Sequence, residues 1–118
     1  MSGERRKVQV SIRESSWLAR LAARKLGYSY VAMVFRRTIH LHNATKEEFL
    51  RRRSWVLHEL KHVEQYDRLG TLGFLVQYFI DYARNGYWNN KFEVEAREAE
   101  GESALLQRYD LSRYGFEG

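Results

Sequence analysis

Two histidines lie four residues apart in the segment 55–66, WVLHELKHVEQY, and a glutamate directly follows the first of them. If this segment is helical, His58 and His62 are one turn apart on one face and can bind the same metal ion. Glu59 is displaced around the helix, so its carboxylate can stand beside the ion without binding it. A carboxylate placed there can take a proton from an activated water molecule. The spacing therefore predicts a zinc site with hydrolytic chemistry, although a solvated helix face with two ordinary histidines would show the same letters.

The composition limits what kind of metal site this chain can build. There is no cysteine among the 118 residues, so disulfides and thiolate sites are excluded. A metal site must then use histidine, carboxylate and water. The glutamate-rich segment 91–100, KFEVEAREAE, is able to provide a third ligand.

The net charge of +5 allows an acidic partner such as nucleic acid. Glutamates are interleaved with the basic residues, and no motif combines aromatic and basic side chains as nucleic-acid-binding domains do. We therefore expect a solubilising surface, and a nucleic-acid partner is the less favoured alternative.

The segment HELKH at 58–62 resembles the HExxH signature of zincin metallopeptidases, and EVEAREA at 93–99 resembles the glutamate helix of their gluzincin branch. Over roughly residues 29–100, the chain looks like small bacterial metallopeptidase domains of unknown function. The resemblance implies a zinc ion held by His58, His62 and Glu93. It also implies that Glu59 is the general base in hydrolysis of a peptide bond, and that the partner is a peptide or protein substrate.

The chain departs from the zincin pattern at three positions. Arg97 stands where the family has an aspartate that hydrogen-bonds a zinc-bound histidine, and Lys61 and Glu64 bring charge into the motif. Two alternatives to a peptidase therefore stay open. One is a zinc-binding or peptide-binding module with little or no catalysis, and the other is a basic interaction domain in which the motif is incidental.

Glu93 has a second interpretation, because Asn90 and Glu93 have the spacing of a helix capping box. With the histidine motif upstream, we favour the role of metal ligand. Glu95 is the reserve ligand, although it faces roughly 200° away around the helix. Glu98 is a poorer candidate still.

Several other residues could contribute to the site. His40 and His42 share one face of a predicted strand, and we expect them to face solvent; the alternatives are a second metal-binding pair or substrate contacts. If the zincin arrangement applies, the strand 38–42 borders the substrate groove. Aromatic side chains that could either stabilise an oxyanion or simply pack are Tyr78, Tyr82 and Tyr87, and those that could form groove walls are Trp55 and Trp88.

The periodicity of the sequence predicts the elements that position these residues. Alternating apolar residues indicate a strand over 7–13, and a hairpin joins strands over 28–35 and 38–42. Helices are expected over 16–26, 45–69, 71–84 and 91–109, the third apolar nearly all round and hence well buried, and the tail after Asp110 is expected to be loosely held. We therefore predict one α+β domain over residues 1–118, with a small antiparallel sheet of about three strands packed on about four helices.

No stretch reaches the roughly 18 apolar residues of a membrane-spanning helix, so we expect no membrane span. The first residues, MSGERRKVQV, lack the apolar run of a signal peptide. On these grounds we expect a cytoplasmic protein.

Overall fold

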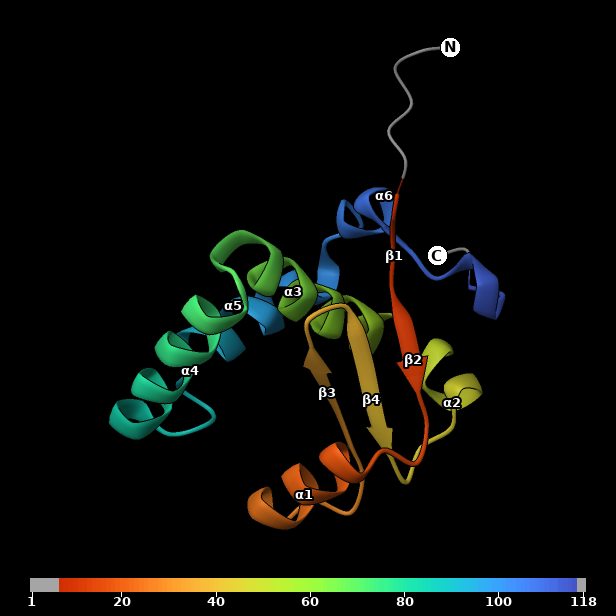
Figure 1. Ribbon diagram of the computed structural model, residues 1–118. Helices are drawn as coiled ribbons and strands as arrows, with labels where there is room; N and C mark the ends of the chain where they lie inside the picture. The colour runs from red at the N-terminus through yellow and green to blue at the C-terminus, as the bar shows by residue number, and fades with distance from the viewer. Residues whose placement is uncertain (1–6, 117–118) are drawn as a thin grey trace.

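The central sheet consists of three strands in the order β2–β4–β3 (Figure 1). These coordinates come from a computed structural model, which describes residues 7–116. β3 and β4 form the predicted antiparallel hairpin, with Arg36 in the turn at φ 60°. β2 runs parallel to β4, not antiparallel as predicted, because the chain crosses over through α1 and β3 before β4 begins. The predicted α+β class is confirmed, with strands β2 (Ser11–Arg13), β3 (Val31–Phe35) and β4 (Thr38–His42).

A second, two-stranded sheet ties the two ends of the described chain together. β1 (Val8–Gln9) pairs in parallel with β5 (Tyr109–Asp110). Beyond β5, Leu111 is buried, and the backbone N–H of Ile12 donates to the Tyr114 hydroxyl at 2.9 Å. The expectation of a loosely held tail is therefore wrong up to Phe116, and residues 117–118 lie outside the described part.

The two faces of the central sheet have different neighbours. Ile39 and Leu41 of β4 are fully buried in the main apolar core, which they share with residues of α3 (Arg53–Leu69). His40 points to the other face, where α1 (Trp17–Leu26) packs against β3 and β4. This alternation follows from the period of two along a strand.

The helix predicted over 45–69 is two helices, α2 (Lys46–Leu50) and α3. The predicted capping box, from Thr45 to Glu48, is present at the start of α2. Arg52 leaves the helical conformation, with φ −105° and ψ 87°, and separates the two helices. No glycine or proline marks this break, so helix propensity alone could not predict it.

The helix α4 (Thr71–Asn85) extends away from the body of the molecule (Figure 1). The prediction that this helix is well buried is therefore wrong. Only Phe74 inserts fully, with its ring 4.4 Å from that of Tyr66 and 5.1 Å from that of Phe92. Apolar residues elsewhere on α4 are exposed, namely Leu72, Val76, Phe79 and Ile80. An all-apolar helix surface is usually buried, but here too few elements are available to cover it.

The fourth predicted helix, over 91–109, is divided into three short pieces. They are α5 (Lys91–Glu98), the 3₁₀ turn η1 (Ala99–Gly101) and α6 (Leu105–Arg108). Gly101 and Ser103 stand at the interruption, and both residue types weaken a helix interior. A further 3₁₀ turn, η2 (Ser112–Tyr114), follows β5. Within residues 7–116, no helix has the length and apolar character needed to cross a bilayer.

Candidate metal centre

Side chains from α3 and α5 converge at one point in the interior. His58 and His62 each place Nε2 at 3.1 Å from Oε1 of Glu93. One ligand atom from each of the three residues lies within 4.8 Å of the others. Glu93 does not close a capping box, because both of its carboxylate oxygens are engaged inside the site while Asn90 alone caps α5 through the N–H of Phe92. The three predicted ligands therefore meet, and their binding of a metal stays a prediction.

The other nitrogen of each imidazole has its own hydrogen-bond acceptor. His58 Nδ1 lies 2.8 Å from Oε2 of Glu100, and His62 Nδ1 lies 2.8 Å from Oε1 of Gln65. The Gln65 side-chain NH₂ group donates to the carbonyl oxygen of Phe92, which leaves Oε1 of Gln65 as the acceptor for His62. This network places a proton on Nδ1 of both rings and directs both Nε2 atoms at Glu93, to which Nε2 donates when the ring is protonated.

The sequence did not reveal Gln65 and Glu100 as partners of the histidines. Gln65 follows His62 by three residues, and Glu100 follows Glu93 by seven, spacings that place side chains on one helix face. Those spacings were the available signal.

Arg97 and the two alternative ligands on α5, Glu95 and Glu98, have other contacts or none with the cluster. Arg97 stacks on the ring of Trp88 at 3.7 Å and donates to the Trp88 carbonyl oxygen. Glu95 accepts hydrogen bonds from Gln65 and Arg68. Glu98 is exposed. Neither glutamate belongs to the cluster. The orientation of the His62 ring depends on Gln65 and not on the residue at position 97.

The remaining oxygen of Glu93 is held by a tyrosine. The Tyr78 hydroxyl donates to Oε2 of Glu93 at 2.6 Å. Burial opposes ionisation of Glu93, but the charge of His62 and hydrogen bonds from both histidines and Tyr78 keep its pKa well below the usual range. Burial and the adjacent carboxylate raise the pKa of Tyr78. Tyr78 is thus a partner of Glu93, and its hydroxyl hydrogen is donated there and not toward an oxyanion.

Glu59 is buried beside the two imidazoles, with only 4% of its surface exposed. Its Oε1 has no hydrogen-bond partner among the described residues. Burial raises the pKa of Glu59 to about 7, although the charges of His58 and His62 oppose the rise. A carboxyl group with such a pKa can both accept and release a proton near neutral pH.

The pKa values of both histidines are raised in the metal-free protein. Burial alone would lower the pKa of His58, but the hydrogen bonds to Glu93 and Glu100 and the charge of Glu59 outweigh it and raise the pKa to about 9. Burial likewise opposes the protonation of His62, and the charge and hydrogen bond of Glu93 reverse that effect and raise its pKa. The excess of negative charge around the two imidazoles favours the binding of a cation at this position.

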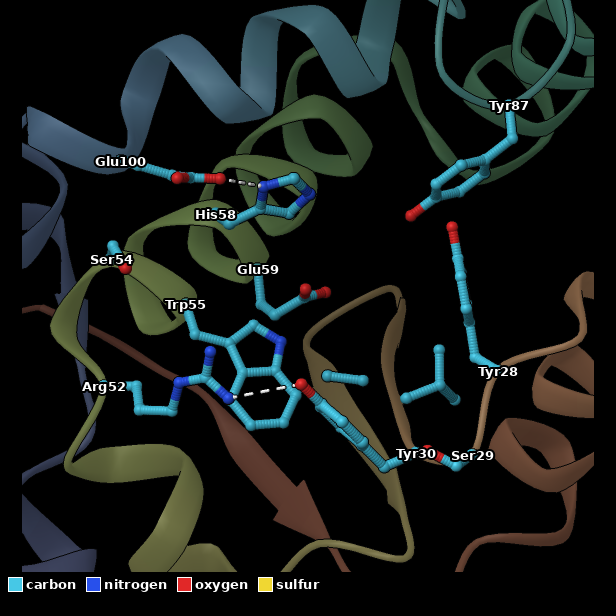
Figure 2. Close-up of a pocket in the computed structure, with 12 residues that line it drawn as sticks. Tyr28, Ser29, Tyr30, Arg52, Ser54, Trp55, His58, Glu59, Tyr87 and Glu100 are labelled. Carbon is cyan, nitrogen blue, oxygen red and sulfur yellow. Dashed lines mark hydrogen bonds and ion pairs between the residues drawn. The ribbon is translucent and has the colours of Figure 1, made fainter.

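A pocket of about 370 Å³ leads from the surface to His58 and Glu59 (Figure 2). At one end, the rings of Tyr28 and Tyr87 meet edge to face, 6.3 Å apart, and their hydroxyl groups point toward each other. Tyr87 therefore faces the site, whereas Tyr82 does not line this pocket.

The far end of the pocket is formed by residues close to the break between α2 and α3. Trp55 forms part of the wall, as the sequence suggested, together with Tyr30 and Arg52. Trp88 instead lies outside the pocket and is 64% exposed.

His40 and His42 lie away from this centre. β4 is the middle strand of the central sheet, and both histidines are half-buried, so the pair does not face solvent freely as expected. His40 is half-buried with Nδ1 2.8 Å from the Ser16 hydroxyl, at the start of α1. Residues of β3, not of β4, line the pocket. The expectation that the strand 38–42 borders the groove is therefore wrong, because β3 lies between β4 and the pocket.

The donor set fits a zinc ion. Two neutral imidazole nitrogens and one carboxylate oxygen are a known ligand set for catalytic zinc, which keeps a further position for water. Both imidazoles have the outer hydrogen-bond acceptor that metal-binding histidines usually have. Comparison of the chain with protein-family models, curated proteins and solved structures found no match.

Proposed function

We propose that this protein is a zinc-dependent hydrolase that cleaves peptide bonds. The observation that carries the proposal is the position of Glu59, whose buried carboxylate lies unpaired beside the cluster of His58, His62 and Glu93. An unsatisfied buried oxygen costs stability and calls for an explanation, and a catalytic role beside a cluster of possible metal ligands is one such explanation.

His58, His62 and Glu93 would hold the zinc ion through the two Nε2 atoms and Oε1. A zinc ion supplies a Lewis acid that polarises a carbonyl group and makes water acidic enough to lose a proton near neutral pH. Gln65 and Glu100 fix the two rings in the required tautomer. Tyr78 restrains the carboxylate of Glu93.

Glu59 accepts a proton from the attacking water molecule and returns it to the leaving amine. In the metal-free protein, burial raises the pKa of this carboxyl group to about 7, a value at which neither protonation state is strongly favoured near neutral pH. Tyr87 presents its hydroxyl to the same pocket and can donate a hydrogen bond to the oxyanion of the tetrahedral intermediate.

A peptide is the substrate class that the pocket supports best. β3 is the last strand in the order β2–β4–β3, so one of its edges has no strand partner within residues 7–116. Val31 and Ala32 of that strand line the pocket. An extended peptide can hydrogen-bond to such an edge while its scissile bond lies near Glu59.

Two measurements test the proposal. Purified wild-type protein should contain one zinc ion per chain by elemental mass spectrometry, and His58→Ala and Glu93→Ala should lose it. Glu59→Gln should keep the zinc and lose hydrolysis of a mixed peptide library. Stoichiometric zinc in both ligand variants, or full hydrolysis by Glu59→Gln, contradicts the proposal. Zinc without hydrolysis in the wild type would instead favour a binding module without catalysis.

A further inference from the structure

Arg52 stands at the end of the pocket that is farther from the Tyr28 and Tyr87 pair (Figure 2). Its guanidinium group lies over the Trp55 ring at 5.0 Å from the centroid and is 3.5 Å from the Tyr30 hydroxyl. The Tyr30 and Trp55 rings themselves meet edge to face, 5.7 Å apart. Two aromatic side chains therefore hold the guanidinium against the pocket wall.

The guanidinium of Arg52 has no carboxylate partner among residues 7–116. Two other arginines do have such partners, Arg37 with Asp67 and Arg68 with Glu95. Arg52 carries five N–H donors, and only one long hydrogen bond, to a neutral hydroxyl, is made. Arg52 is itself exposed where it lines the pocket, so its other donors are accessible to a ligand.

We propose that Arg52 binds a carboxylate group of the peptide substrate and so determines specificity. A guanidinium group matches a carboxylate with two parallel hydrogen bonds, and stacking on Trp55 fixes the plane in which they form. Such a held and unpaired fork is therefore suited to a planar anion. The inference rests on the proposed peptidase function, since it names the substrate of the same pocket.

The position of Arg52 sets the distance between the carboxylate and the bond that is cleaved. Arg52 precedes Glu59 by seven residues, which is about 10 Å along a helix. An extended peptide rises about 3.3 Å per residue, so a carboxylate within about three residues of the scissile bond could reach Arg52. It is either an aspartate or glutamate side chain or the carboxyl terminus of the peptide.

Binding can be measured apart from catalysis with zinc-loaded Glu59→Gln protein. The probes are fluorescein-labelled heptapeptides of alanine and leucine of three kinds: one with a free carboxyl terminus, the same peptide amidated, and a series of amidated versions with one glutamate moved along the chain. Fluorescence anisotropy should show that one carboxylate-bearing form binds about tenfold more tightly than the neutral amide. The form that gains identifies the terminus or the side chain as the source.

Further substitutions in the Glu59→Gln background locate the effect. Arg52→Gln should abolish the preference, and Arg52→Lys should keep only part of it because an ammonium lacks the fork. Arg51→Gln is the matched control, since Arg51 is exposed and does not line the pocket, and it should keep the preference. Equal binding of all peptides, absence of binding, or a preference that survives in Arg52→Gln would overturn the inference. Failure of wild-type zinc protein to hydrolyse any peptide would count against the hydrolase proposal and leave a measured carboxylate preference intact.

Discussion

The hydroxyl of Tyr78 donates a hydrogen bond to Oε2 of Glu93 at 2.6 Å, which leaves Oε1 of the same carboxylate to face the two imidazoles. Tyr78 belongs to α4 and Glu93 to α5, so the contact also connects α4, which is mostly exposed to solvent, with the candidate metal centre. The carboxylate is thereby held in one orientation before any ion binds. Preorganisation of this kind is how outer hydrogen bonds raise metal affinity.

Tyr78→Phe should lower zinc affinity about tenfold, because Oε2 of Glu93 loses its donor and the carboxylate gains freedom to rotate. Competition with a chromophoric chelator measures the change. Tyr82→Phe removes the same hydroxyl one turn later on α4 and serves as the control, with affinity unchanged. An unaltered affinity in Tyr78→Phe would mean that the tyrosine has no part in holding the ligand.

Gln65→Leu should destabilise the metal-free protein by about 2–4 kcal/mol, since Gln65 is fully buried and its loss leaves His62 Nδ1 unpaired and removes the hydrogen bond to the Phe92 carbonyl oxygen. Zinc affinity should fall as well, because the His62 ring is no longer fixed. Urea unfolding and chelator competition measure the two effects. The same substitution at Gln77, which is exposed on α4, should change neither quantity.

The meeting of His58, His62 and Glu93 could be predicted from the sequence. The hydrogen-bond partners that orient these side chains could not. Helical spacing places His58 and His62 on one face, and the resemblance supplied Glu93 as the third member. Hydrogen-bond partners come from pairs of elements whose docking is set by the whole core. The acceptor for His58, Glu100, therefore appears only once η1 has packed against α3.

Local sequence patterns also predicted the positions of most helices and strands. These patterns did not predict features that depend on tertiary contacts. The β3–β4 hairpin follows directly from alternation and a two-residue turn. The break at Arg52 has no local signal, and the exposure of Phe79 on α4 depends on how few elements surround that helix. Periodicity states that a face is apolar, but not whether a partner exists to bury it.

Metal-free protein should lose stability as the pH rises from 5 to 9. Glu59 has a pKa raised from its ordinary 4.5 to about 7, so its ionisation in the fold costs up to about 3 kcal/mol as the pH passes through that interval. His58 has a pKa raised from 6.5 to about 9, so its stabilising protonated form is fully present below 6.5 and is lost as the pH approaches 9. Urea unfolding at several pH values in the presence of a chelator measures the trend. Glu59→Gln should remove the loss between pH 5 and 7, and a wild-type stability that increases over this range would contradict the assignment.

Zinc affinity should change in the opposite direction over the same range. Protons on His58 and His62 compete with the ion, so the apparent affinity should increase up to about pH 9, where His58 has lost its proton. Chelator competition at pH 6, 7, 8 and 9 measures it, and proton release detected with a pH indicator gives an independent count. An affinity that is constant between pH 6 and 9 would show that these imidazoles are not the ligands.

The two aromatic residues of α4 at positions 74 and 79 should respond very differently to truncation. Phe74 is 4% exposed and packs against Tyr66, Tyr78 and Phe92, so Phe74→Ala should cost about 3–5 kcal/mol in the free energy of unfolding. Phe79 is 62% exposed, so Phe79→Ala should change that free energy by no more than about 0.5 kcal/mol. Urea unfolding of both variants at low protein concentration measures the difference. A loss at position 79 as large as that at position 74 would mean that the apolar face of α4 is covered in solution, which the isolated chain does not show.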